Sequence, residues 1–205
     1  MFDQVRLSLQ SLTMVLTVSA LATNMAPVFA ADQLGWPQFN LASGEKQCEG
    51  KAFAVNWSHG RVLLLLPLHL LSPEAGYSRY VQPADVARVV ISVDLLDLQK
   101  NSVLASSHQS LLKTGWTVGQ DRGDLSGDLM AFELSEVGRL EPFHLFYGLV
   151  PVGTKVWILS KDLSSHSCEP ERYEGTVSNA DSTGLVIRMD TAMGALSSSG
   201  APVVN

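Results

Sequence analysis

The apolar and polar residues of this chain alternate with the period of short β-strands. Residues 51–57 alternate, with three large apolar side chains at positions that share one face. Turn residues follow at 58–60, and residues 61–68 form a nearly continuous apolar run. These two segments predict a hairpin whose second strand is buried on both sides.

The rest of the chain repeats this pattern. Glycine, proline, aspartate and asparagine punctuate it about every ten residues, which is typical of an all-β sandwich or barrel. Outside the first thirty residues no segment carries a sustained helical period. Residues 32–49, rich in turn formers, predict an arm or loop. Further strands are expected at 87–95, 115–118, 129–134, 143–149, 154–160, 173–178 and 184–189.

The first thirty residues have the pattern of an export signal. Arg6 and the amino terminus give a positive start, and a largely apolar stretch follows to residue 22. Residues 26–30 then place small side chains at the cleavage positions before Ala31. The alternative is an uncleaved membrane anchor, which the many polar residues in the stretch disfavour. We therefore expect a secreted or periplasmic chain that is free of the membrane after cleavage near Ala30.

Composition and charge narrow the classes of function. The chain is 46% hydrophobic and 17% charged, which is typical of a globular protein of one domain or two small fused barrels. The formal net charge is -6, and the basic residues are scattered. Since a nucleic-acid binder shows a basic patch or stripe, nucleic acid is not expected as a partner.

The chain contains two cysteines, Cys48 and Cys168. An even number in an exported protein predicts a disulfide, and a bond closing so long a loop would contribute about 4–5 kcal/mol in the chain-entropy model. Two buried free thiols are the alternative. Two isolated cysteines do not complete a tetrahedral zinc site, and no pair of histidines has ligand spacing, so no metal is expected.

The most specific motif is Ser-Ser-Ser-Gly-Ala-Pro-Val-Val at residues 197–204. It resembles the nucleophile motif of the trypsin/chymotrypsin family of serine proteases, with Ser199 as the nucleophile. The chemistry fits, because an attacking hydroxyl needs exposure at a tight turn with backbone N–H groups aimed at the developing oxyanion. By itself the motif also fits a surface loop.

Two further segments resemble the same family in the same order. His69 ends the apolar run in Leu-Pro-Leu-His-Leu-Leu, where the family carries its general base. Asp128 opens Asp-Leu-Met-Ala-Phe-Glu-Leu, which resembles the strand whose aspartate orients the histidine. Asp94, Asp97 and Asp124 are competing carboxylates, although Asp94 follows His69 closely.

The resemblance implies an all-β fold of two six-stranded Greek-key barrels. It places the first barrel at 51–139, after an arm at 31–50, and a second barrel with the nucleophile at 140–205. The implied activity is that of an exported serine endopeptidase on polypeptide substrates, without a cofactor. Backbone N–H groups of Ser197 and Ser199 would form the oxyanion hole.

The sequence also departs from the family. Ser197 stands where a glycine is usual, and Ser198 replaces an aspartate, which argues against activation by a new amino terminus. The sequence ends six residues after Ser199, so either it is a fragment of a longer product or the second barrel is expected to be incomplete. Asp190 is a candidate for an acidic specificity pocket.

Two other functions stay open. A catalytically impaired or truncated pseudo-protease would keep the fold and act as a binding module, with exposed apolar surface where strands are missing. A secreted β-sandwich for adhesion or ligand binding would make the motif matches chance. The mutual distances of His69, Asp128 and Ser199 discriminate between these readings.

Overall fold

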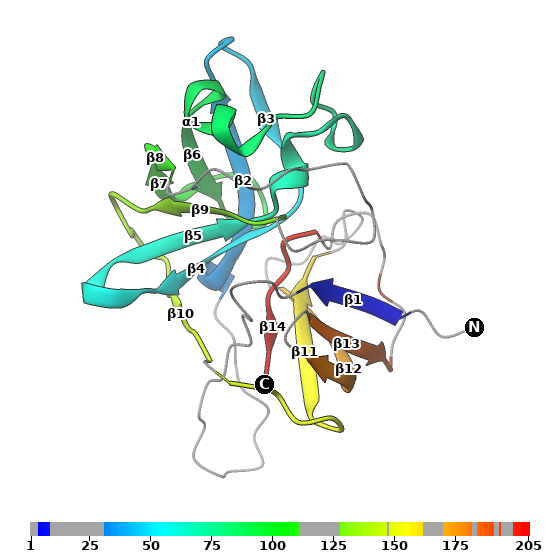
Figure 1. Ribbon diagram of the computed structural model, residues 1–205. Coiled ribbons are helices and arrows are strands. Elements are labelled where there is room, and N and C mark those ends of the chain that lie inside the picture. Colours follow the sequence, from blue (N-terminus) through cyan, green and yellow to red (C-terminus); the bar gives the residue numbers. More distant parts are fainter. Residues whose placement is uncertain are drawn as a thin grey trace.

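The computed structural model is an all-β molecule, as the sequence predicts (Figure 1). It describes residues 4–8, 31–110, 128–146, 148–161, 170–181, 184–190, 193 and 199–205. Within these described residues the strands form one sheet of nine and one sheet of five, and both sheets are open and mainly antiparallel. The finer expectation of two six-stranded Greek-key barrels stays a prediction.

The large sheet is built from residues between Leu34 and His144. Its order is β7-β6-β2-β4-β5-β9-β8, with β3 paired to β2 and the short β10 parallel to β4. The strands are β2 (Leu34–Leu41), β3 (Lys46–Cys48), β4 (Ala52–Asn56), β5 (Val62–Leu66), β6 (Val90–Leu96), β7 (Val103–Ser107), β8 (Gln109–Ser110), β9 (Met130–Glu133) and β10 (Phe143–His144).

Short helical turns connect these strands. The elements are η1 (Ala31–Gln33), η2 (Ser58–Gly60), η3 (Leu68–Leu71), η4 (Pro73–Ala75), η5 (Pro83–Asp85) and the single-turn helix α1 (Val86–Val89). The expected strand at 87–95 is therefore wrong in its first residues, because α1 precedes β6. The expected strand at 115–118 lies outside the described residues.

The expected loop at 32–49 is wrong, because β2 lies within it and pairs with β4 and β6 in the large sheet. Gly35 and Pro37 gave this segment the composition of a turn. A Cβ atom built on Gly35 would lie 2.2 Å from the carbonyl oxygen of Leu96. The glycine therefore permits two strand backbones to approach closely instead of marking a turn.

The small sheet has the order β1-β13-β12-β11-β14. Its strands are β1 (Gln4–Ser8), β11 (Lys155–Ser160), β12 (Glu171–Asp181), β13 (Gly184–Met189) and β14 (Val203–Val204). Strand β1 comes from the segment predicted as an export signal. Residues 9–30 lie outside the described residues, so cleavage near Ala30 stays a prediction. In the part of the chain that the structure describes, no helix is long and apolar enough to span a membrane.

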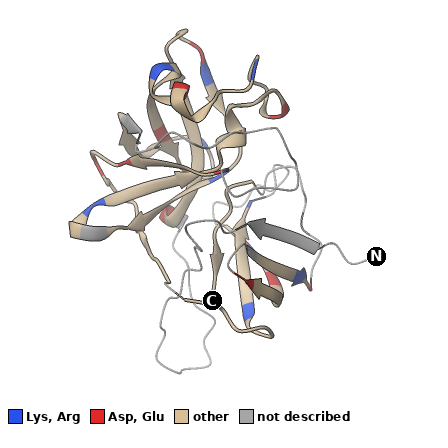
Figure 2. Cartoon of the chain, viewed as in Figure 1, with Lys and Arg blue, Asp and Glu red and all other residues tan. Residues whose placement is uncertain are grey.

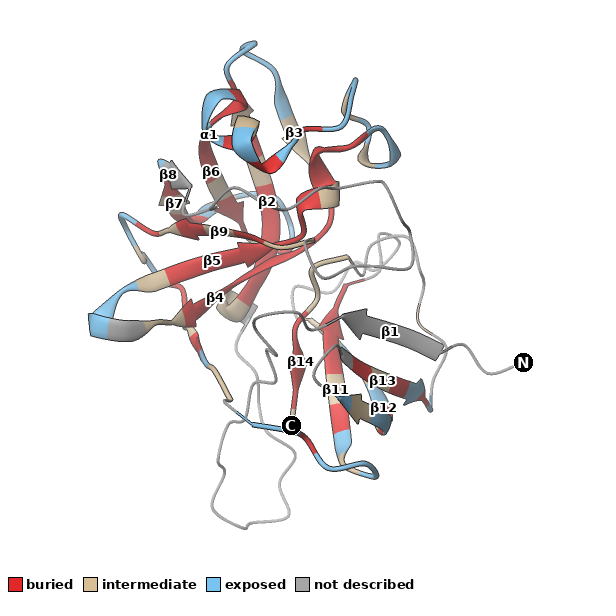
Figure 3. Cartoon of the chain, in the orientation of Figure 1, coloured by how far each residue is buried: buried red, intermediate tan, exposed pale blue. Residues whose placement is uncertain are grey.

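Strand β5 is buried on both sides, as its continuous apolar run predicts. Leu64 and Leu66 pack into a cluster within the large sheet, with Phe39 and Phe132. Leu63 and Leu65 face a second cluster on the other side. Figure 3 shows this strand buried along almost its whole length.

The second cluster joins the two sheets. Leu159 of β11 and Val204 of β14 pack there with Leu34 and Phe53 of the large sheet. Phe143 contacts Phe53 edge to face, with ring centroids 6.0 Å apart. This shared core fixes the small sheet, and the segment before β14, against the ends of β4 and β5.

Candidate functional site

His69 is held at the surface by the residues around it. It lies in η3, directly after β5 and Pro67. Leu68, Leu70 and Leu71 of this turn are all buried in the core of the large sheet. The His69 side chain keeps 36% of its surface exposed. The apolar neighbours therefore anchor the turn and leave the imidazole accessible.

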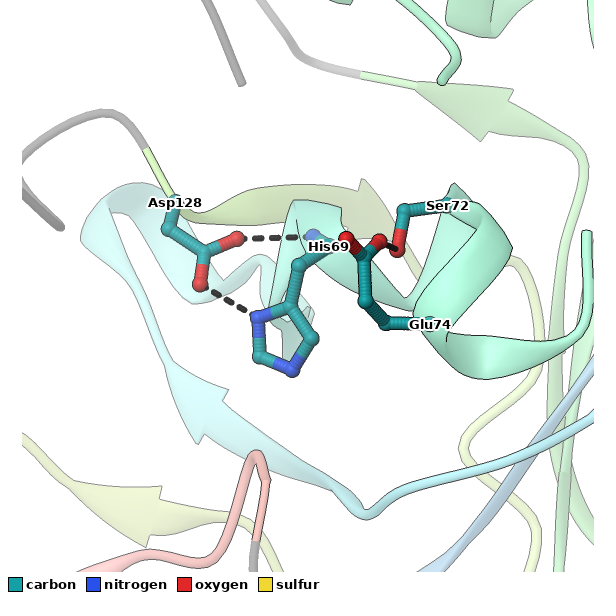
Figure 4. Close-up of polar contacts among 4 residues, drawn as sticks. All are labelled: His69, Ser72, Glu74 and Asp128. Atoms are coloured by element: carbon teal, nitrogen blue, oxygen red, sulfur yellow. Dashed lines mark hydrogen bonds and ion pairs between the residues drawn. The ribbon is translucent and has the colours of Figure 1, made fainter. Parts of the chain in front are cut away.

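Asp128 reaches His69 because of the register between two strands. Leu66 of β5 is paired with Met130 of β9, and Asp128 lies two residues before Met130. Its Oδ1 accepts the backbone N–H of His69 at 2.7 Å, and its Oδ2 lies 2.5 Å from Nδ1 (Figure 4). An ionised carboxylate only accepts hydrogen bonds, so Nδ1 carries the proton. The other ring nitrogen, Nε2, is then left as a proton acceptor.

The competing carboxylate Asp94 has other partners. It accepts hydrogen bonds from Asn40 at 2.9 Å and Ser106 at 2.7 Å, within a polar network on β2, β6 and β7. Asp124 lies outside the described residues. Among the described carboxylates that the sequence offered as candidates, Asp128 is the one hydrogen-bonded to His69.

Asp97 is occupied by the turn after β6. Although its burial raises the pKa of this carboxyl, hydrogen bonds from the Ser102 hydroxyl and from neighbouring backbone N–H groups lower it, and the net direction is downward. These contacts give Asp97 a structural role in closing the loop between β6 and β7.

Ser199 is seated beside the histidine turn through its backbone and that of Gly200. The Ser199 carbonyl accepts the backbone N–H of Lys51 at 2.7 Å. Gly200 has a φ of +84°, and a Cβ atom there would lie 2.0 Å from the Lys51 carbonyl oxygen and 2.8 Å from Cδ of Pro67. Because Pro67 lies two residues before His69, this contact brings the predicted nucleophile loop against the turn that carries the predicted base.

The structure joins only two members of the predicted triad directly. His69 and Asp128 are hydrogen-bonded, whereas the described residues show no hydrogen bond between Ser199 and His69. Ser199 is half-buried. Ser197, the other predicted member of the oxyanion hole, lies outside the described residues.

Cys48 is a half-buried free thiol, and burial raises its pKa. Cys168 lies outside the described residues, so the predicted pairing of Cys48 with Cys168 stays a prediction. Among the described residues no three histidine, cysteine or acidic side chains gather as metal ligands.

Asp190 is an ion-pair partner in the structure. Its carboxylate lies 2.7 Å from Nζ of Lys155, which also approaches Glu174 at 3.0 Å. The two carboxylates raise the pKa of Lys155. Asp190 would therefore meet a positively charged substrate side chain with its own charge already balanced, which weakens it as the base of an acidic pocket.

Lys51 is a member of the site region that sequence reasoning missed. It is fully buried, and its Nζ lies 3.3 Å from the ring centroid of Trp36, a cation–π contact. Burial, and then the charges of Lys100 and Lys161, lower the pKa of Lys51 to about 7. Its position at the start of an alternating strand gave no signal for this environment, which arises from residues distant in sequence.

We expect the unfolding free energy to rise between pH 7 and pH 9, because the unfolded chain holds a proton on Lys51 that the folded chain has lost. Lys51 should supply about 1–3 kcal/mol of this rise, and Lys51→Met should remove that part. Well below pH 7 both states carry the proton, so the contribution is flat there. Urea unfolding at the two pH values measures it, with the exposed Lys46→Met as control. An unchanged pH slope in Lys51→Met would contradict the assignment.

Comparisons with known proteins leave the family open. No protein-family model matches the chain, and no curated protein matches it. A solved structure described as the crystal structure of Deg5 is similar. The two chains are 16% identical, with a TM-score of 0.43, over 85% of this chain and 75% of that one. The function proposed below therefore rests on the residues of the site.

Proposed function

We propose that this protein is a serine endopeptidase in which Ser199 is the nucleophile, His69 the general base and Asp128 the group that orients the base. The observation that carries the proposal is the pair of hydrogen bonds that the Asp128 carboxylate accepts from the ring and the backbone N–H of His69. The packing of Gly200 against Pro67 supports it, since it seats Ser199 next to the same turn. These contacts support the proposal that three motifs distant in sequence form one site.

The chemistry follows from the proton positions. The hydroxyl oxygen of Ser199 attacks the carbonyl carbon of a peptide bond while Nε2 of His69 takes the hydroxyl proton. The resulting imidazolium is stabilised by Asp128 and gives its proton to the leaving amine, so that an acyl-enzyme forms on Ser199. Water then repeats the sequence, with His69 again as base, and releases the acid product.

The remaining parts of the proposal concern the oxyanion and the substrate. Backbone N–H groups of Ser197 and Ser199 would donate to the oxyanion, and the left-handed Gly200 sets the turn that follows the nucleophile. The proposed substrate class is polypeptide, and the export pattern of the first thirty residues supports a reaction outside the cytoplasm. Among the described residues, basic and acidic positions are scattered over both sheets in Figure 2 and form no basic stripe.

A binding module without catalysis is the second candidate. It is favoured by one observation, the absence of a hydrogen bond from Ser199 to His69 among the described residues. Ser197, at a position where the resembled family has glycine, points the same way. In this candidate the His69–Asp128 pair would be a structural remnant of the site.

Labelling of the purified protein with a fluorophosphonate probe tests the proposal. We expect the wild-type chain to be labelled and Ser199→Ala to remain unlabelled, because the probe needs an activated nucleophile and a formed oxyanion hole. Ser72→Ala is the matched control. Ser72 lies three residues after His69, and its hydroxyl donates a hydrogen bond to the Glu74 carboxylate at 2.8 Å (Figure 4). A folded wild-type chain that resists the probe would favour the binding module.

A further inference from the structure

The outer edge of β13 is covered by a strand from the opposite end of the sequence. The five residues of β1 pair with β13 in antiparallel register, from Gln4 opposite Arg188 to Ser8 opposite Gly184. Figure 1 shows β1 lying along β13 at this edge of the small sheet. The other edge of β13 is paired with β12. The outer edge of β13 therefore provides backbone pairing positions for one whole β-strand.

The register gives this site a preference for one pattern of residues. Val5 is paired with Ile187 and Leu7 with Leu185. Ile187 and Leu185 are buried in the core of the small sheet. Residues directly opposite in an antiparallel pair belong to the same face of the sheet. A strand at this site therefore needs apolar residues at the two positions that face the core.

One position of the site also has a charge preference. Arg188 is exposed, and Gln4 is the residue opposite it. Opposite charges at directly paired positions stabilise a sheet, whereas like charges destabilise it. An acidic residue in the place of Gln4 should therefore strengthen pairing with β13.

Export would empty the site. Strand β1 lies inside the segment predicted to be removed near Ala30, so the released chain would present the N–H and C=O groups of β13 along a free edge. Free edges of this kind pair with extended segments of other chains. In the precursor, β1 would thus occupy the edge of β13. After cleavage near Ala30, a segment of another chain would take its place.

We propose that the free edge of β13 is the docking site for an extended segment of a partner polypeptide. The partner pairs antiparallel to Gly184–Met189, with apolar residues opposite Leu185 and Ile187 and an acidic residue opposite Arg188. The proposal rests on the export part of the proposed function and needs no catalysis. Its failure is thus distinguishable from failure of the probe-labelling test.

Peptide binding to the full chain tests the site. Prolines in β1, as Val5→Pro with Leu7→Pro, remove two N–H donors that face β13 and free its edge, and prolines at Leu12 and Thr13 outside the paired residues are the control. A capped fluorescent peptide of residues 3–8 should bind the freed chain at least tenfold more tightly than the wild type or the control, by fluorescence polarisation.

Matched peptides test the pattern. A peptide with residues 4 and 5 exchanged, and 6 and 7 exchanged, has the same composition but moves its apolar residues to the other face. It should bind at least tenfold more weakly. A peptide with Gln4→Glu should bind several-fold more tightly at low salt, and Arg188→Ala should remove this gain. Equal binding of the original and exchanged peptides would overturn the proposal.

Hydrogen exchange supplies a second measurement if the proline variant is poorly folded. The amides of Leu185 and Ile187 should be protected in the wild-type chain, exposed in the chain released after export, and protected again by the peptide. Protection in the released chain that rises with protein concentration, with doubled mass and no response to peptide, would assign the edge to a second copy. That result would also overturn the proposal.

Discussion

Replacing Asp128 with Asn is expected to lower kcat/KM on a peptide substrate by about 10⁴-fold and to leave the protein folded. The reason lies in the two hydrogen bonds of the carboxylate. The backbone N–H of His69 requires an acceptor, so the amide oxygen of Asn takes the place of Oδ1. The amide NH₂ then faces Nδ1, which must become an acceptor, and the ring proton moves to Nε2. In this tautomer His69 no longer accepts the proton of Ser199.

Steady-state kinetics near neutral pH measures this effect, with Asp94→Asn as control. Asp94 is also a half-buried carboxylate with side-chain partners, but those partners are Asn40 and Ser106. Asp94→Asn should keep activity within a few-fold of the wild type. Activity of Asp128→Asn within tenfold of the wild type would remove Asp128 from the proposed mechanism.

Replacing Gly200 with Ala is expected to abolish probe labelling and to lower the unfolding free energy by several kcal/mol. Alanine at a φ of +84° costs about 1–2 kcal/mol by itself. The larger part comes from the Cβ atom, which would lie 2.0 Å from the carbonyl oxygen of Lys51. The positions of this Cβ atom and of the Lys51 carbonyl oxygen are both set by the backbone. The turn that holds Ser199 must therefore move away from Pro67 and His69.

Gly153→Ala is the control that separates the steric clash of a Cβ atom from the cost of a positive φ. Gly153 has a φ of +90°, and a Cβ atom there would meet nothing within 4 Å. Urea unfolding and labelling rates should therefore show a small loss of stability and normal labelling for Gly153→Ala. Equal effects of the two substitutions on both measurements would mean that the contact of Gly200 with Lys51 does not position the nucleophile.

Local patterns were sufficient to predict the strands that carry the site. The continuous apolar run of β5 could be recognised because each of its faces is buried in a different core cluster. The pairing of His69 with Asp128 was expected from the resemblance of their two segments to the trypsin/chymotrypsin family. In the structure it depends on the neighbouring positions of β5 and β9, as the register of Leu66 with Met130 shows.

What could not be predicted depends on contacts between distant segments. Strand β2 contains Gly35 and Pro37, and only the close approach of Leu96 explains the glycine. The environment of Lys51 depends on Trp36, which belongs to that same unrecognised strand. The occupant of the β13 edge was missed because Gln4–Ser8 has the composition of an export signal, and that composition also suits an edge strand.

The contacts that position Ser199 have a consequence for the synthesis of the protein. The Lys51 backbone and Pro67, against which Ser199 and Gly200 pack, are made early in translation, and Ser199 is made late. His69 follows β5 and Asp128 precedes β9, two strands that pair within the large sheet, so the two residues can meet before the nucleophile exists. A growing chain would therefore hold a prepared base with nothing to activate. With Ser199 as the proposed nucleophile, unfolded segments of the growing chain and of neighbouring nascent chains would be safe from hydrolysis until β14 docks.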